Sequence, residues 1–298
     1  MAPSRSKKST NGRANWSQRT YLRVSERLAP DRAARLLSKM WFRLPAPPET
    51  RLRGNAPADA TTFTLDTDEG QVWGYDWGEG PLVYAFHGWA GSSHDLNHIS
   101  ATLRANGMRV IAFDATSHGN SESGPWGDRY SSAMHMVGAG RAVMKKFGPP
   151  DALLTHSLGC LTAPLAYKEL YETPVSVPTV MMAPFVGGAD AFAGTLNSVV
   201  PVGPRIMERV LPLLQKRAGV PLADYTLSDH QPDAPVLVIH DRGDRPNPFA
   251  FGQELVDQWP IATMHATSGL GHRRILSCPE TVGVARRFIT DHVASGRH

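Results

Sequence analysis

The chain alternates short apolar runs with segments of helical periodicity, and this alternation constrains its fold more than any other feature. The apolar runs that carry little charge are residues 82–86, 109–113, 152–154, 179–182 and 236–239. Helix-like segments lie between most of them, at residues 93–105, 131–146, 160–170 and 249–259. Strands that are apolar on both faces and alternate with helices are typical of a parallel sheet covered on both sides. The sequence therefore predicts an α/β fold.

Further strands extend this sheet at both ends of the alternating region. Residues 62–66 and 71–75 form a strand pair around a turn at residues 67–70, and residues 262–265 precede a last helix at 280–293. Together these segments predict a mostly parallel central sheet of about eight strands, with helices on both faces.

One interval interrupts the rhythm, because about fifty residues separate two core strands at positions 185–233. A structureless loop of that length is uncommon inside a compact domain, so the interval is expected to be an inserted helical element. An apolar stripe supports this: Ile206, Met207, Val210, Leu211 and Leu214. We expect Pro212 to kink this helix or to divide it in two.

The N-terminal part differs in charge from the rest of the chain. Residues 1–53 carry 13 Lys and Arg against 3 Asp and Glu, whereas the remaining residues carry 18 against 24. We expect a basic extension at residues 1–57, with a disordered start at 1–18, a helix at 21–42 broken by Pro30, and a linker at 45–57. The extension could contact a membrane surface weakly or tether a nucleic acid. Packing of its helix on an acidic surface of the body, residues 58–298, is the favoured interpretation.

Composition excludes several other classes of protein. No apolar run approaches the roughly 20 residues that span a bilayer, and the basic start lacks the apolar core of a secretory signal. Two cysteines make no disulfide framework, so a reduced, cytoplasmic location is expected. No glycine-rich cofactor motif is present, and His94 and His98 lack a third ligand, so neither a cofactor nor a metal is predicted.

Polar residues follow the predicted strands where a parallel sheet collects its functional groups. Ser157 lies at the turn between an apolar run and a helix, which would push its hydroxyl out of the fold. Acidic side chains follow a later strand at Asp241 and Asp244, and His272 follows the last one. A serine, an acid and a histidine in this order are suited to nucleophilic catalysis. His87, His118 and His156 lie near the same edge, and His240 is expected to pack at a strand end.

In these motifs the chain resembles the α/β-hydrolase superfamily over residues 61–295. The resemblance implies that Ser157 is the nucleophile, that Asp244 rather than Asp241 is the acid and that His272 is the base. His87-Gly88 matches the segment before the oxyanion hole, so the backbone N–H groups of Trp89 and Leu158 would stabilise the oxyanion. Residues 114–121 resemble a further family loop, and residues 185–233 lie where the family places its cap. The chain departs from the Gly-x-Ser-x-Gly pattern at Thr155, whose β-branched side chain is expected to crowd the turn.

The resemblance implies a serine hydrolase that forms an acyl-enzyme from a carboxylic ester, thioester or lactone with an apolar acyl or alcohol part. His156, Phe185 and Trp89 are the expected pocket residues. Two alternatives stay open: an acyltransferase with the same triad, and an inactive protein of this fold that only binds. The expected partner is a small ester-type molecule and not a nucleic acid. The oligomeric state cannot be read from the sequence.

Overall fold

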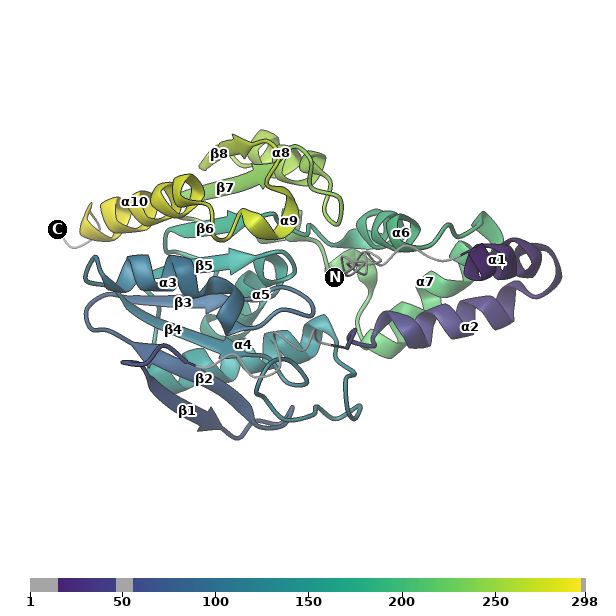
Figure 1. Ribbon diagram of the computed structural model, residues 1–298, viewed down its shortest axis with the longest axis horizontal. Coiled ribbons are helices and arrows are strands. Elements are labelled where there is room, and N and C mark those ends of the chain that lie inside the picture. Colours follow the sequence, from purple (N-terminus) through teal and green to yellow (C-terminus); the bar gives the residue numbers. More distant parts are fainter. Residues whose placement is uncertain (1–15, 47–55, 296–298) are drawn as a thin grey trace, which may run out of the picture.

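The computed structural model describes residues 16–46 and 56–295, and an eight-stranded sheet forms its centre (Figure 1). In chain order the strands are β1 Thr61–Leu65, β2 Val72–Trp77, β3 Leu82–Phe86, β4 Arg109–Asp114, β5 Ala152–His156, β6 Thr179–Met182, β7 Val236–Asp241 and β8 Ala262–Thr267. Across the sheet their order is β1-β2-β4-β3-β5-β6-β7-β8. β2 pairs antiparallel with both of its neighbours, and every other pair is parallel. The predicted mostly parallel sheet of about eight strands is confirmed.

Helices cover both faces of this sheet. α4 Ala133–Phe147, α5 Gly159–Tyr171 and α8 Phe249–Gln258 contribute buried side chains to one core. α3 Asn97–Arg104 and α10 Pro279–Ser295 contribute to the core on the opposite face. The predicted helix at 93–105 begins as a 3₁₀ turn, Ser93–Leu96, before α3. A short helix, α9 Gly271–Arg274, follows β8.

Strand β3 shows why the parallel strands read as continuous apolar runs. Tyr84 and Phe86 point into the core under α4 and α5, whereas Val83 and Ala85 point into the core under α3 and α10. Side chains alternate between the faces of a strand, so a strand buried on both faces must be apolar at every position. All five residues of β3 are buried.

The interval between β6 and β7 is largely helical. It contains α6 Gly188–Val199, α7 Pro204–Ala218 and the 3₁₀ turns Leu222–Asp224 and Leu227–His230. α7 passes through Pro212 as one helix, so of the two expectations for this proline, a kink or a division, the division is wrong. Pro212 lies on the exposed side, while Ile206, Val210 and Leu214 are buried.

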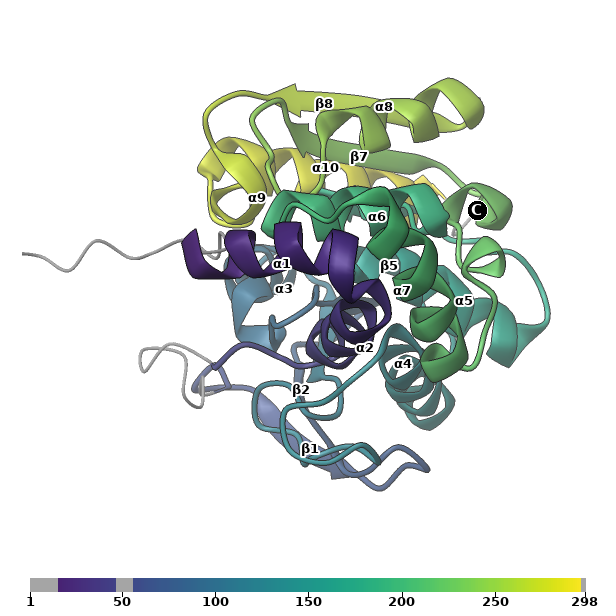
Figure 2. The same ribbon diagram turned by 90° about the vertical axis from the view of Figure 1, so that its right-hand side faces the viewer.

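The N-terminal helices pack on this inserted segment. α1 Trp16–Leu28 and α2 Pro30–Trp41 meet at Ala29, so the helix is broken at Pro30 as predicted. Leu22, Ala33 and Leu37 share one buried cluster with α6 and α7, rather than lying on an acidic surface of the body. Figure 2 shows α1 and α2 in front of α6 and α7, the helices of the segment inserted between β6 and β7.

Parts of the expected extension lie outside the described residues. These parts are residues 1–15 of the expected disordered start and residues 47–55 of the expected linker. Residues 16–18 belong to α1, so the expected disorder is wrong for them. In the part of the chain that the structure describes, no helix is long and apolar enough to cross a bilayer.

Candidate active site

Ser157 lies in a strained turn between β5 and α5. Its φ of 53° places a non-glycine residue in the left-handed region, which costs on the order of 1–3 kcal/mol. Two backbone hydrogen bonds hold this conformation. The Ser157 N–H donates to the Met182 carbonyl (2.9 Å), and its carbonyl accepts from the Phe185 N–H (3.2 Å). The end of β6 therefore fixes the orientation of the serine.

Two glycines allow other backbone segments to approach this turn. A Cβ on Gly159 would lie 2.5 Å from the Phe86 carbonyl oxygen. A Cβ on Gly88 would lie 2.7 Å from Cβ of Ser157. The loop after β3 therefore packs directly against the serine, which a larger residue at either position would prevent.

Thr155 fits its position at the end of β5 without entering the turn. Its buried hydroxyl donates to the Val180 carbonyl on the neighbouring strand (2.9 Å) and lies 3.2 Å from Sγ of Cys160. The residue is part of a regular strand, so the expected crowding at the turn is not seen. Gly159 provides the close approach instead.

Ser157, His272 and Asp244 form a continuous chain of hydrogen-bonding contacts. Oγ of Ser157 lies 3.1 Å from Nε2 of His272, and Nδ1 of His272 lies 2.8 Å from Oδ2 of Asp244. The carboxylate can only accept, so we assign the Nδ1 proton to His272. Nε2 is then free to accept the serine proton. The sheet brings these three residues together from the loops after β5, β7 and β8.

Asp244 is held as a carboxylate despite its burial. Burial opposes ionisation, but hydrogen bonds from His240 and His272, together with the Asn247 N–H, lower its pKa to about 2. The Asn247 N–H donates to Oδ1 at 3.0 Å, and Nε2 of His240 lies 3.5 Å from Oδ2. The negative charge beside His272 is therefore permanent at neutral pH.

Asp241 has a different set of partners. Its Oδ1 accepts from the Gly243 N–H, and its Oδ2 accepts from the Thr267 hydroxyl and the Leu270 N–H, each at 2.9 Å. Burial opposes the charge, but these donors lower its pKa. Asp241 thus binds the loop that carries His272, whereas the carboxylate bonded to the imidazole is that of Asp244.

The neighbouring histidines bind the backbone of the same loops. Nε2 of His156 lies 3.0 Å from the His272 carbonyl, and burial next to His272 lowers the pKa of His156 to about 3. A neutral His156 therefore donates to the main chain of His272. His87 bridges two loops, with Nδ1 2.7 Å from the Gly88 carbonyl and Nε2 accepting from the Ala115 N–H at 3.0 Å.

The N–H groups predicted for the oxyanion belong to the two segments next to Ser157. Leu158 directly precedes α5, and Trp89 follows the Gly88 segment that packs on the serine. Among the described residues, neither N–H has a hydrogen-bond acceptor. Their role as donors to an oxyanion stays a prediction.

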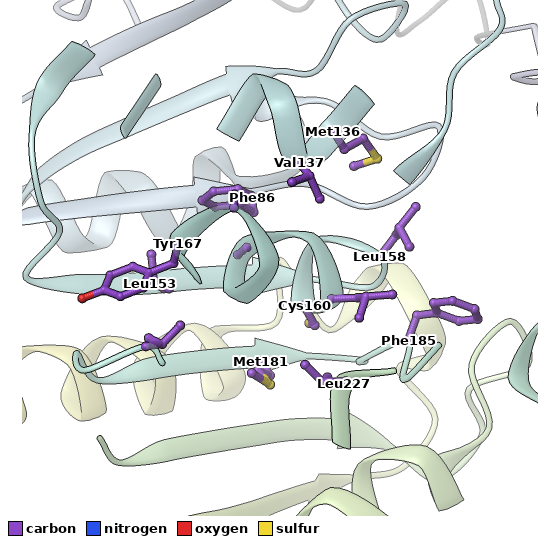
Figure 3. Close-up of a cluster of buried hydrophobic side chains, with 14 of the residues drawn as sticks. Phe86, Met136, Val137, Leu153, Leu158, Cys160, Tyr167, Met181, Phe185 and Leu227 are labelled. Carbon is purple, nitrogen blue, oxygen red and sulfur yellow. The ribbon is translucent and has the colours of Figure 1, made fainter. Parts of the chain in front are cut away.

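The expected pocket side chains differ in their surroundings. Phe185 is buried, and its ring lies 5.2 Å from that of Phe192 in α6; Figure 3 shows Phe185 and Leu158 at the same end of the strands. Trp89 is half-buried, with its ring 5.5 Å from that of His118. His156 is buried and bonded to His272, so its expected role in a substrate pocket stays a prediction.

Asn247 is a site residue that the sequence did not reveal. Its buried side-chain amide donates to the Ala183 carbonyl (2.8 Å) and lies 3.4 Å from Oγ of Ser157. Its backbone N–H binds Asp244. The only available signal was a polar residue between two prolines, three positions after the acid.

Comparisons with known proteins identify the family to which the fold belongs. A profile described as the α/β hydrolase family matches residues 82–283. No curated protein sequence matches the chain.

Solved structures share the fold at low sequence identity. An esterase from a Rhodococcus species is 21% identical with a TM-score of 0.56, over 78% of this chain and 99% of the other. An epoxide hydrolase from Vigna radiata is 15% identical with a TM-score of 0.59, over 80% and 100%. The α/β hydrolase domain-containing protein 10 from mouse is 14% identical with a TM-score of 0.62, over 79% and 99%. With the family profile covering more than half of its length, the chain belongs to the α/β hydrolase family.

Proposed function

We propose that the protein is a serine hydrolase that cleaves carboxylic esters, thioesters or lactones through an acyl-enzyme. The observation that carries the proposal is the contact chain from Ser157 through His272 to Asp244, with distances of 3.1 and 2.8 Å. A serine hydroxyl is a weak nucleophile until an adjacent base accepts its proton. Here a base lies within reach of Oγ, and an ionised carboxylate orients that base.

Acylation begins when Oγ of Ser157 attacks the substrate carbonyl carbon and its proton passes to Nε2 of His272. The carbonyl oxygen becomes an oxyanion between the N–H groups of Trp89 and Leu158. Loss of one such donor typically costs roughly 3 kcal/mol of transition-state stabilisation. His272 then protonates the leaving alcohol or thiol as the bond to it breaks. Asp244 stabilises the imidazolium throughout.

Deacylation uses the same groups with water as the nucleophile. His272 accepts a proton from water, the oxygen attacks the acyl carbon, and the proton returns to Oγ as the acid leaves. A serine nucleophile favours this acyl chemistry over the opening of an epoxide, for which this superfamily uses an aspartate. The preference for ester over epoxide substrates rests on the resemblance to this family.

The substrate preference follows from the apolar side chains beside the serine. Phe185 and Phe192 are buried aromatic residues, and the ring of Trp41 lies 5.7 Å from Phe192. We propose that residues 185–233 form a cap over the strand ends and that α2 contributes to it. An apolar acyl or alcohol group would pack against this wall.

Asn247 is proposed as a positioning residue for Ser157. Its amide lies between the serine Oγ and the Ala183 carbonyl, so it favours the serine rotamer that faces His272. Asn247→Ala should lower kcat about fivefold and change KM little, since a hydrogen bond to a positioned group contributes about 1 kcal/mol. Steady-state kinetics on one ester would measure both constants. A larger change in KM than in kcat would contradict a positioning role.

A panel of chromogenic esters, thioesters and lactones of increasing chain length tests the proposed function. The expected result is hydrolysis that rises with the length of the apolar group and is abolished in Ser157→Ala. Absence of hydrolysis across the panel by the folded wild type would overturn the proposal. Transfer of the acyl group to an added alcohol in preference to water would favour an acyltransferase.

A further inference from the structure

We propose that the outer face of α1 and α2 binds an anionic lipid surface and that the substrates of the site are esters dispersed in such a surface. The lipid binding is inferred from α1 and α2 alone. The choice of substrates rests on the proposed function.

The inner face of the helix pair is fixed to the inserted helices. Beside the shared apolar cluster, Glu26 accepts from the backbone N–H groups of Arg205 (2.8 Å) and Ile206 (3.2 Å) at the start of α7. Asp31 accepts from Nε of Arg209 on α7 (2.8 Å). The acidic residues of α1 and α2 thus both bind α7. α1 and α2 therefore pack with α6 and α7 as one helical layer.

The outer face carries apolar side chains that the described part of the chain leaves uncovered. In the part of the chain that the structure describes, the exposed large hydrophobic residues all belong to α1 or α2: Trp16, Tyr21, Val24, Leu28, Leu36 and Met40. Trp16 and Leu28 are 81% and 80% exposed. Tyr21, Val24 and Leu28 are three and four residues apart, so they form one stripe along α1. Such a patch commonly marks an interaction surface.

Exposed basic side chains lie along the same two helices. Those at positions 16–43 are all exposed: Arg19, Arg23, Arg27, Arg32, Arg35, Lys39 and Arg43. Apolar and aromatic residues beside exposed bases on a short helix are typical of helices that lie in the interface of an anionic membrane. A second copy would bring like charges together, and a nucleic acid would leave Val24 and Leu28 without an apolar partner.

The position of the helix pair relates this surface to the active site. Figure 1 shows α1 and α2 at the end of the molecule opposite α10, with α6 and α7 between them and the sheet. Trp41 at the end of α2 contacts Phe192, which contacts Phe185, whose N–H binds the Ser157 carbonyl. A bilayer bound by the outer face would therefore lie on the side where the strand ends hold Ser157.

Co-sedimentation of the full chain with lipid vesicles tests the docking. Vesicles of phosphatidylcholine alone are compared with vesicles that also contain phosphatidylglycerol. We expect binding at least tenfold stronger to the anionic vesicles, with loss of binding in high salt. Val24→Ser with Leu28→Ser should weaken binding at least tenfold, and so should Arg23→Gln with Arg27→Gln. Lys145→Gln with Lys146→Gln removes two exposed bases from α4 and should leave binding unchanged.

Equal or absent binding to the two vesicle types would overturn the proposal. Equal losses in the α4 control and in the α1 variants would also overturn it, as would self-association or DNA binding that needs the same α1 residues. Hydrolysis of a water-soluble ester should be unchanged in the α1 variants, which shows that they fold. Ser157→Ala should still bind vesicles, so a failure of the proposed chemistry is seen separately from a failure of docking.

Discussion

The candidate active site at the strand ends and the helical layer of α1, α2, α6 and α7 are organised in different ways. At the site, the loops after β5, β7 and β8 each contribute one side chain, and the sheet sets the distances between them. In the helical layer, α1 and α2 pack on α6 and α7 through residues about 180 positions apart in sequence, such as Leu22 and Ile206. The first arrangement depends on local turns and the second on a shared apolar cluster. Small changes should therefore be costly in the first region and tolerated in the second.

Asp241 at the end of β7 and Asp244 in the loop after it give the largest expected difference in activity between two variants. Asp244→Asn should lower kcat about 10⁴-fold, because an amide cannot hold His272 in the required tautomer or stabilise the imidazolium. Asp241→Asn replaces an acceptor that binds backbone N–H groups, so it should destabilise the fold by about 1–3 kcal/mol. Ester kinetics and urea unfolding of both variants measure these effects. A larger kinetic loss in Asp241→Asn would reverse the assignment of the acid.

Two glycines test the contrast in packing. Gly159→Ala places a Cβ 2.5 Å from a backbone oxygen and should cost about 2–3 kcal/mol, with loss of activity. Gly194→Ala in α6 meets no atom within 4 Å, so it should stabilise the protein by about 0.5–1 kcal/mol. Thermal and urea unfolding compare them. Equal effects of the two substitutions would show that the site is not the more tightly packed region.

The buried histidines near the site predict how stability depends on pH. Burial lowers the pKa of His118 and of His156 to about 3, whereas an unfolded histidine titrates near 6.5. The unfolded chain therefore binds more protons between these values, and stability falls as the pH falls from about 6.5 to 3. Each histidine contributes a slope of roughly 1.4 kcal/mol per pH unit.

The low pKa of Asp244 adds a loss of stability only at lower pH, from about 4 down to 2. Urea unfolding between pH 6 and 4 measures the histidine contribution. His156→Gln should reduce the slope, and His98→Gln, which removes an exposed ring, serves as the control. An unchanged slope in His156→Gln would contradict a neutral, buried His156.

The contacts between α1 and α7 give the smallest expected effects. Glu26→Ala removes the acceptor of two N–H groups at the start of α7 and should cost about 1 kcal/mol. Asp31→Ala removes an exposed ion pair and should cost at most about 0.5 kcal/mol. If the two variants unfold at the same denaturant concentration, Glu26 does not act as a cap for α7.

The same contrast explains what could be predicted from the sequence. The strands and their order in the chain follow from local apolar runs, and Ser157, Asp244 and His272 each follow such a run. The hydrogen bond that holds the Thr155 side chain could not be predicted, because its acceptor Val180 lies 25 residues away on another strand. Asn247 was missed for a similar reason, since its contacts depend on how the loop after β7 folds back on Ala183.

The packing of α1 and α2 was also beyond the sequence. Their apolar stripe showed that one face is buried but not which surface buries it. Net charge suggested the acidic body, whereas the structure shows an apolar cluster with α6 and α7. Burial of apolar surface outweighs the attraction between exposed charges, which water and salt weaken.

Covalent labelling tests whether the strand-end loops make Ser157 a nucleophile. The folded protein is treated with a fluorophosphonate probe, and the modified peptide is identified by mass spectrometry. We expect one adduct, on Ser157, which is absent in Ser157→Ala and much slower to form in His272→Ala. Failure of the folded wild type to label, or labelling that persists in Ser157→Ala, would contradict it.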